Sequence, residues 1–121
     1  MKLIIQAMLL SSALVGMASF AETTPVQFVK GSYCGSFDGN VVGRKFTLQL
    51  NAGQLLSIEV NASKDIYPIV KDPKGKTLVA VDESNPYAYN TTKKGKYTVS
   101  FDVEDESYPY AEIKFCALRL V

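Results

Sequence analysis

The side chains that could do chemistry in this chain are tyrosines, carboxylates and lysines, because it contains no histidine. Histidine is the usual general base near neutral pH and the commonest metal ligand. A Ser-His-Asp or Cys-His arrangement and a histidine zinc site are therefore excluded. We expect a protein that is not an enzyme and that uses no cofactor and no metal ion, with calcium at an acidic run as the one metal alternative.

Two segments, residues 87–89 and 108–110, each carry tyrosines two positions apart. In an extended chain this spacing places both rings of a segment on one face. Tyrosine offers a large rigid contact area with a hydrogen-bonding tip, which suits protein interfaces and sugar faces. A proline beside or within each segment favours a sheet edge or a loop. We expect these rings to bind a partner, with packing on the core as the alternative: Tyr87, Tyr89, Tyr108 and Tyr110.

An acidic run covers residues 102–106 and includes Asp105 and Glu106. We expect these two carboxylates to contact a basic partner, because opposite charge speeds encounter and sets specificity. The alternatives are a solvated loop and a calcium site, although no EF-hand spacing is present. Lys93, Lys94 and Lys96 form the opposite patch, which suits either an anionic polymer or the protection of a sheet edge.

The elements that position these residues are strands, because apolar and polar residues alternate with a period of two. Phe46, Leu48 and Leu50 alternate with polar neighbours, and Tyr97 to Val103 repeats the pattern. Turn residues recur about every 8–12 positions, which is typical of an antiparallel sandwich or barrel. We predict an all-β, jelly-roll-like antiparallel β-sandwich with strands near 25–29, 31–37, 42–50, 55–61, 66–71, 77–82, 86–91, 96–103 and 110–119.

The first 21 residues have the pattern of an export signal. Lys2 precedes an apolar run to Met17, and small residues precede a cleavage point after Ala21. The run is shorter than the roughly 20 residues that a membrane span needs. We predict a signal peptide over residues 1–21 and a single domain over residues 22–121, in the periplasm or secreted, without a membrane span after cleavage. Without Lys2 the charges balance, which argues against a nucleic-acid partner.

Cys34 and Cys116 are the two cysteines of the chain. In an exported protein such a pair predicts one disulfide, with two free thiols as the alternative. Adjacent antiparallel strands or facing sheets would both satisfy the required Cα separation. The bridge would close most of the domain and stabilise it by roughly 4–5 kcal/mol in the chain-entropy model.

The order of several segments resembles a known domain family. They are Phe28 to Gly31, Phe46 to Ile58, Asp72 to Leu78 and Lys94 to Val99. Together they resemble the bacterial pre-peptidase C-terminal type of jelly-roll domain, and within it the periplasmic inhibitors of g-type lysozyme. The resemblance implies that surface loops occlude the active-site cleft of a lysozyme, an enzyme class that commonly presents a basic surface.

We therefore expect a protein-binding inhibitor of a cell-wall lytic enzyme, most specifically a g-type lysozyme. Two alternatives remain open at this point. One is an immunity protein against a secreted antibacterial effector. The other is a carbohydrate-binding module in which the four tyrosines named above stack on sugars.

Overall fold

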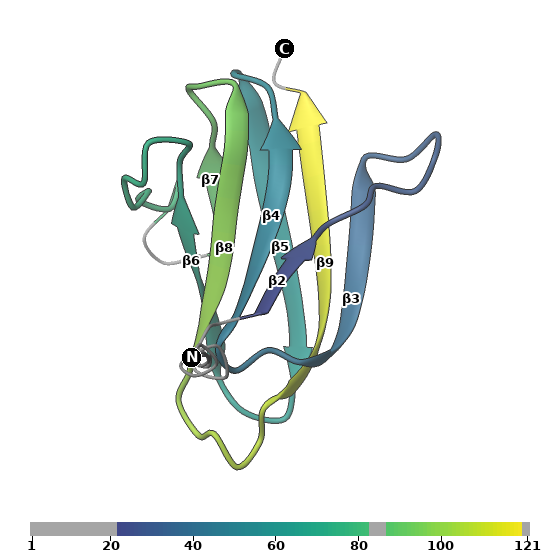
Figure 1. Ribbon diagram of the computed structural model, residues 1–121, viewed down its shortest axis with the longest axis vertical. Coiled ribbons are helices and arrows are strands. Elements are labelled where there is room, and N and C mark those ends of the chain that lie inside the picture. The colour runs from purple at the N-terminus through teal and green to yellow at the C-terminus, as the bar shows by residue number, and fades with distance from the viewer. Residues whose placement is uncertain (1–21, 83–86, 120–121) are drawn as a thin grey trace, which may run out of the picture.

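The computed structural model describes residues 22–82 and 87–119 (Figure 1). The predicted signal peptide lies outside the described residues. Within the described ranges no helix is long and apolar enough to cross a membrane.

Two four-stranded sheets make up the described structure. The first contains, in spatial order, β2 (Glu22–Pro25), β4 (Arg44–Leu50), β8 (Gly95–Val103) and β6 (Ile66–Lys71). The second contains β3 (Cys34–Asn40), β9 (Tyr110–Arg119), β5 (Gln54–Ala62) and β7 (Ala88–Asn90). All pairs are antiparallel except β2 with β4, which is parallel. The predicted all-β sandwich is confirmed, with this one parallel pair as a difference.

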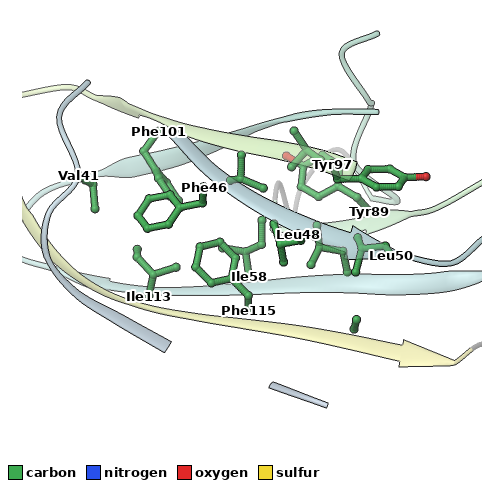
Figure 2. Close-up of a cluster of buried hydrophobic side chains, with 14 of the residues drawn as sticks. Val41, Phe46, Leu48, Leu50, Ile58, Tyr89, Tyr97, Phe101, Ile113 and Phe115 are labelled. Carbon is green, nitrogen blue, oxygen red and sulfur yellow. The ribbon is translucent and has the colours of Figure 1, made fainter. Parts of the chain in front are cut away.

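The core lies between the sheets and contains the apolar half of each alternating strand. Phe46 on β4 is fully buried and packs against the ring of Phe37 at a centroid distance of 4.9 Å. It also packs against the rings of Phe101 and Phe115 at 5.6 and 5.2 Å (Figure 2). These rings come from both sheets, and aromatic pairs at such distances add to the energy of burial. Phe46 therefore joins the two layers at their centre.

The disulfide between Cys34 and Cys116 is present and joins β3 to β9 within one sheet. The two residues lie directly opposite each other in the strand register. Their neighbours Phe115 and Ala117 are buried, so Cys116 faces away from the core. Of the two arrangements left open by the sequence, the structure has the one between adjacent strands.

Irregular segments cover both sides of the sandwich. Residues 77–82, predicted as a strand, instead run between the sheets: Leu78 donates to Val70 of β6, and Val81 donates to Ala88 of β7. Thr77 forms an isolated antiparallel bridge with Lys71, but the backbone bonds of the segment then pass from one sheet to the other, so no continuous ladder with either sheet forms. On the other side, residues 26–29 cross from β2 to β3 and pass close to Gly35, where an added Cβ would lie 2.5 Å from the Gln27 carbonyl oxygen.

Candidate functional site

The loop between β8 and β9, residues 104–109, is shaped by Asp105. The Tyr108 amide donates to the Asp105 carbonyl at 2.9 Å, and the Ser107 amide donates to the Asp105 carboxylate at 3.0 Å. An aspartate that accepts from the backbone two residues ahead forms a common turn. Asp105 is therefore partly engaged in its own loop, whereas Glu106 is exposed.

Two neighbouring segments fix the position of this loop at the lower end of Figure 1. The Val41 amide donates to the Pro109 carbonyl at 3.0 Å, and the Glu104 amide donates to the Asp65 carbonyl at 3.4 Å. The Lys64 ammonium lies 5.3 Å from the centre of the Tyr108 ring, a cation–π distance. We call residues 63–65 and 104–110 the loop end.

Tyr108 and Tyr110 are both accessible at the loop end. Their exposed fractions are 47% and 67%. Tyr110 is the first residue of β9, lies opposite Asn40 of β3, and borders a surface hollow with Asp38 and Asn61. The structure thus places these two predicted rings where a partner can reach them.

The other tyrosine pair faces inward. Tyr89 is 4% exposed, and its hydroxyl donates to the Pro68 carbonyl of β6 at 3.4 Å. Tyr87 is half-buried, donates to the Ile66 carbonyl at 3.4 Å, and stacks on Tyr67 at 6.2 Å. Both rings lie on one face of the segment that enters and forms β7, as the spacing predicts, but this face is turned toward β6 of the other sheet. We correct the expectation for Tyr89, whose ring is part of the core and not accessible to a partner.

Negative charge gathers beside the loop end. The charge of Asp65 raises the pKa of the Tyr67 hydroxyl above its ordinary value, with smaller contributions from burial, Tyr87 and Glu104. Burial raises the pKa of Tyr87, and Asp65 adds to the effect. The charge of Asp65 contributes to both pKa shifts, as the main cause for Tyr67 and as a secondary cause for Tyr87. The loop end thus carries four carboxylates, of Asp65, Glu104, Asp105 and Glu106, against the single ammonium of Lys64.

The outer face of the second sheet is hollowed next to the loop end. A hollow of about 550 Å³ is bordered by residues of β3, β5 and β9. Its outward side chains are those of Ser36, Asp38, Glu59, Asn61, Glu112 and Lys114. Among the described residues, no group of three or more side chains is arranged to hold a metal ion.

The sequence interpretation missed Lys64, Asp65 and Tyr67. They follow the second predicted hairpin strand and look like an ordinary polar turn entering a strand. Only the pairing of β6 with β8 places Ile66 opposite Val103, and with it residues 63–65 next to the acidic loop. The adjacent opposite charges of Lys64 and Asp65 are a weak local signal, because the sequence alone does not place this turn next to the acidic loop.

No protein-family model and no curated protein matches this sequence. Solved structures do match, and three are crystal structures of PliG, a periplasmic inhibitor of g-type lysozyme. The protein from Aeromonas hydrophila has a TM-score of 0.57 at 18% identity, covering 81% of this chain and 97% of its own. Those from Salmonella Typhimurium and, as a mutant, Escherichia coli have TM-scores of 0.56 and 0.55 at 14% identity, covering 80% of this chain and 98% of theirs. At these identities the likeness shows that this chain has the fold of the PliG inhibitors.

Proposed function

We propose that this protein is a periplasmic inhibitor of g-type lysozyme that binds the enzyme with its loop end. The observation that carries the proposal is the fold, which matches three such inhibitors over 97–98% of their lengths. The resemblance found in the sequence points to the same group. The matched proteins are inhibitors, which also supports a role without catalysis for this chain.

The loop end has the properties that a cleft-blocking surface needs. Its loop is tied to β3–β4 and β5–β6 by backbone hydrogen bonds, so ordering it costs little entropy on binding. Tyr108 supplies a large contact surface, and the Lys64 ammonium contacts its ring in a cation–π arrangement that helps to orient it. The four carboxylates suit a basic cleft and would increase the association rate at low salt.

The test is a turbidity assay of cell-wall lysis by g-, c- and i-type lysozymes, with and without excess oxidised protein starting at Glu22. We expect protection against the g-type enzyme only. Lysis that proceeds unchanged with all three enzymes would refute the lysozyme assignment.

Variants then locate the surface. Tyr108→Ala and Glu106→Gln should weaken inhibition, and the effect of Glu106→Gln should shrink in 0.5 M salt because exposed charges are screened. The matched control is Tyr33→Ala, because Tyr33 is 65% exposed and lies beside Cys34, at the opposite end of the same sheet. Equal losses with Tyr33→Ala and Tyr108→Ala would refute binding by the loop end.

A further inference from the structure

Charge is segregated between the two ends of this sandwich. Opposite the loop end, segment 71–76, which begins at the last residue of β6, and segment 93–96, which runs into the start of β8, carry six lysines and one acidic residue, Asp72. The lysines are Lys71, Lys74, Lys76, Lys93, Lys94 and Lys96, and all but Lys93 are exposed. We call these two segments the lysine end. They carry a net charge of +5, whereas the acidic and basic residues from 22 to 121 balance.

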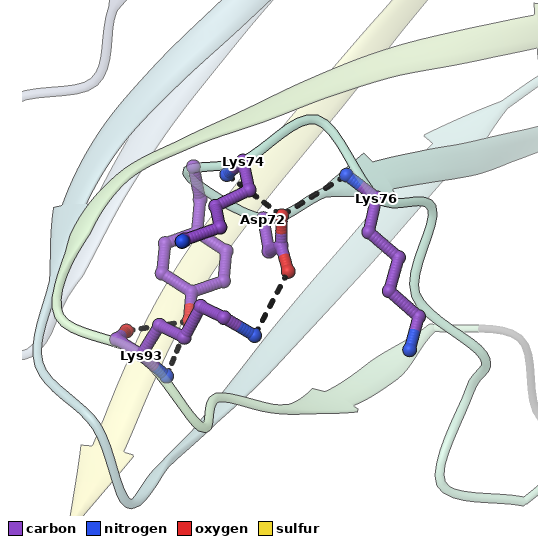
Figure 3. Close-up of polar contacts among 5 residues, drawn as sticks. Asp72, Lys74, Lys76 and Lys93 are labelled. Atoms are coloured by element: carbon purple, nitrogen blue, oxygen red, sulfur yellow. Dashed lines mark hydrogen bonds and ion pairs between the residues drawn. The ribbon is translucent and has the colours of Figure 1, made fainter.

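The buried carboxylate of Asp72 holds the two segments of the lysine end together (Figure 3). Its side chain is 3% exposed, accepts from the amides of Lys74 and Lys76 at 2.8 and 3.0 Å, and lies 3.4 Å from the Lys93 ammonium. The amide contacts fold segment 71–76 into a tight turn, and the ion pair joins this turn to segment 93–96. Asp72 is therefore neutralised within the fold, while the other lysines face solvent.

Further contacts fix the second segment. The Tyr97 hydroxyl donates to the Lys93 carbonyl at 2.6 Å and accepts from the Lys93 amide at 3.2 Å. At Gly95, which has a φ of 150°, an added Cβ would lie 2.8 Å from Pro73, so the glycine allows the two turns to touch. Lysines that are distant in sequence are thus presented together on a rigid support, without the cost of gathering them on binding.

We infer that the lysine end binds a polyanionic glycan, a chain of sugars that carries carboxylate or phosphate groups at regular intervals. Lysine binds carboxylate and phosphate groups as a point charge. Several such groups along one glycan chain can contact several lysines at the same time, which strengthens binding. Neither segment exposes a large hydrophobic side chain, so burial of apolar groups would not support binding to a bilayer. The loop end, on the opposite side of the molecule, would remain free to bind a protein while the lysine end holds the cell-envelope glycan.

Surface plasmon resonance on immobilised polygalacturonate tests this inference, with its neutral methyl ester as the reference surface. We expect binding to the acid form only, and loss of that binding in 0.5 M salt. Lys74→Glu/Lys94→Glu should weaken binding by about tenfold or more, since each lysine near an anionic surface contributes about fivefold. The control Lys45→Glu/Lys114→Glu changes the net charge equally at exposed strand positions and should change affinity less than about twofold. Urea unfolding midpoints of both variants confirm that each is folded.

Three results with polygalacturonate would overturn the inference. They are no binding to the acid form, equal losses in the two double variants, and binding that resists salt but is lost on Tyr110→Ala, which would assign glycan binding to the hollow beside β9. Tighter binding to anionic phospholipid vesicles than to polygalacturonate would overturn the choice of a glycan. The lysozyme assay is unaffected by any of these outcomes, so this inference and the proposed function fail separately.

Discussion

Removal of the disulfide should cost this domain a large part of its stability. The bridge spans 82 positions of the chain. In the chain-entropy model, a crosslink closing a loop of this length lowers the entropy of the unfolded chain by about 15 cal/mol/K. At 25 °C this stabilises the folded state by about 4.5 kcal/mol. Small domains have a total stability of about 5–15 kcal/mol. Cys34→Ser/Cys116→Ser should therefore still fold, but with only a small remaining free energy of unfolding. The bonded residues face outward, so the replacement removes little core contact.

Urea unfolding followed by circular dichroism and tyrosine fluorescence measures this loss. If the free energy of unfolding falls by about 1.5 kcal/mol per molar urea, the midpoint of the transition should fall by roughly 3 M. The reduced native protein should have the same urea midpoint as the double variant, because each of them lacks only the crosslink. Cys116 lies six residues from Tyr110 along β9, or about 20 Å, so inhibition should persist below the transition. A loss below about 1 kcal/mol with unchanged sheet content would refute the reasoning, since the unfolded chain would then already hold its ends together.

Three other substitutions test the packing and the buried polar groups. Gly35→Ala should destabilise the fold by about 1–3 kcal/mol, because the methyl group of the new alanine would clash with the Gln27 carbonyl. Urea unfolding measures the loss. Ser36→Ala is the control and should have little effect. Tyr97→Phe should lower the free energy of unfolding by about 1–2 kcal/mol, because the Lys93 carbonyl loses its donor; unchanged stability would contradict this. Hydrogen bonds from the Lys76 and Lys74 amides, with the Lys93 ammonium, hold the pKa of Asp72 below its ordinary value. The resulting stabilisation is fully present above the pKa of this carboxyl group in the unfolded chain. It disappears as the pH falls through the lower pKa of Asp72 in the folded protein. Asp72→Asn should therefore make the urea midpoint less dependent on pH below about 4.

The alternating pattern was sufficient to predict most strands, because each strand has one buried face. Phe46, Leu48 and Leu50 are all buried, as the period of two requires. The pattern failed for residues 77–82, where alternation is present but the backbone bonds to two different sheets. Local sequence also could not predict the parallel pairing of β2 with β4, which depends on contacts about 20 residues apart.

The candidate site was predicted less well than the fold. The spacing of Tyr87 and Tyr89 correctly placed both rings on one face, but the direction of that face depends on which strands flank β7. Tyr108 and Tyr110 are exposed because a loop and a strand terminus leave them uncovered, and their binding of a partner stays a prediction. The acidic loop was recognised from its composition, whereas its neighbours Lys64 and Asp65 become visible only through the pairing of β6 with β8.

The segments that close the two sides of the sandwich also protect the protein from polymerisation. A free edge strand offers unpaired amides and carbonyls to any similar strand that meets it. Here residues 77–82 bond to β6 and β7, and Val29 donates to Cys34 at the edge of β3. The remaining edge, β2, has only four residues and ends at a proline. A concentrated solution of this protein should therefore resist growth into fibrils, and deletion of residues 77–82 would expose two templates for it at once.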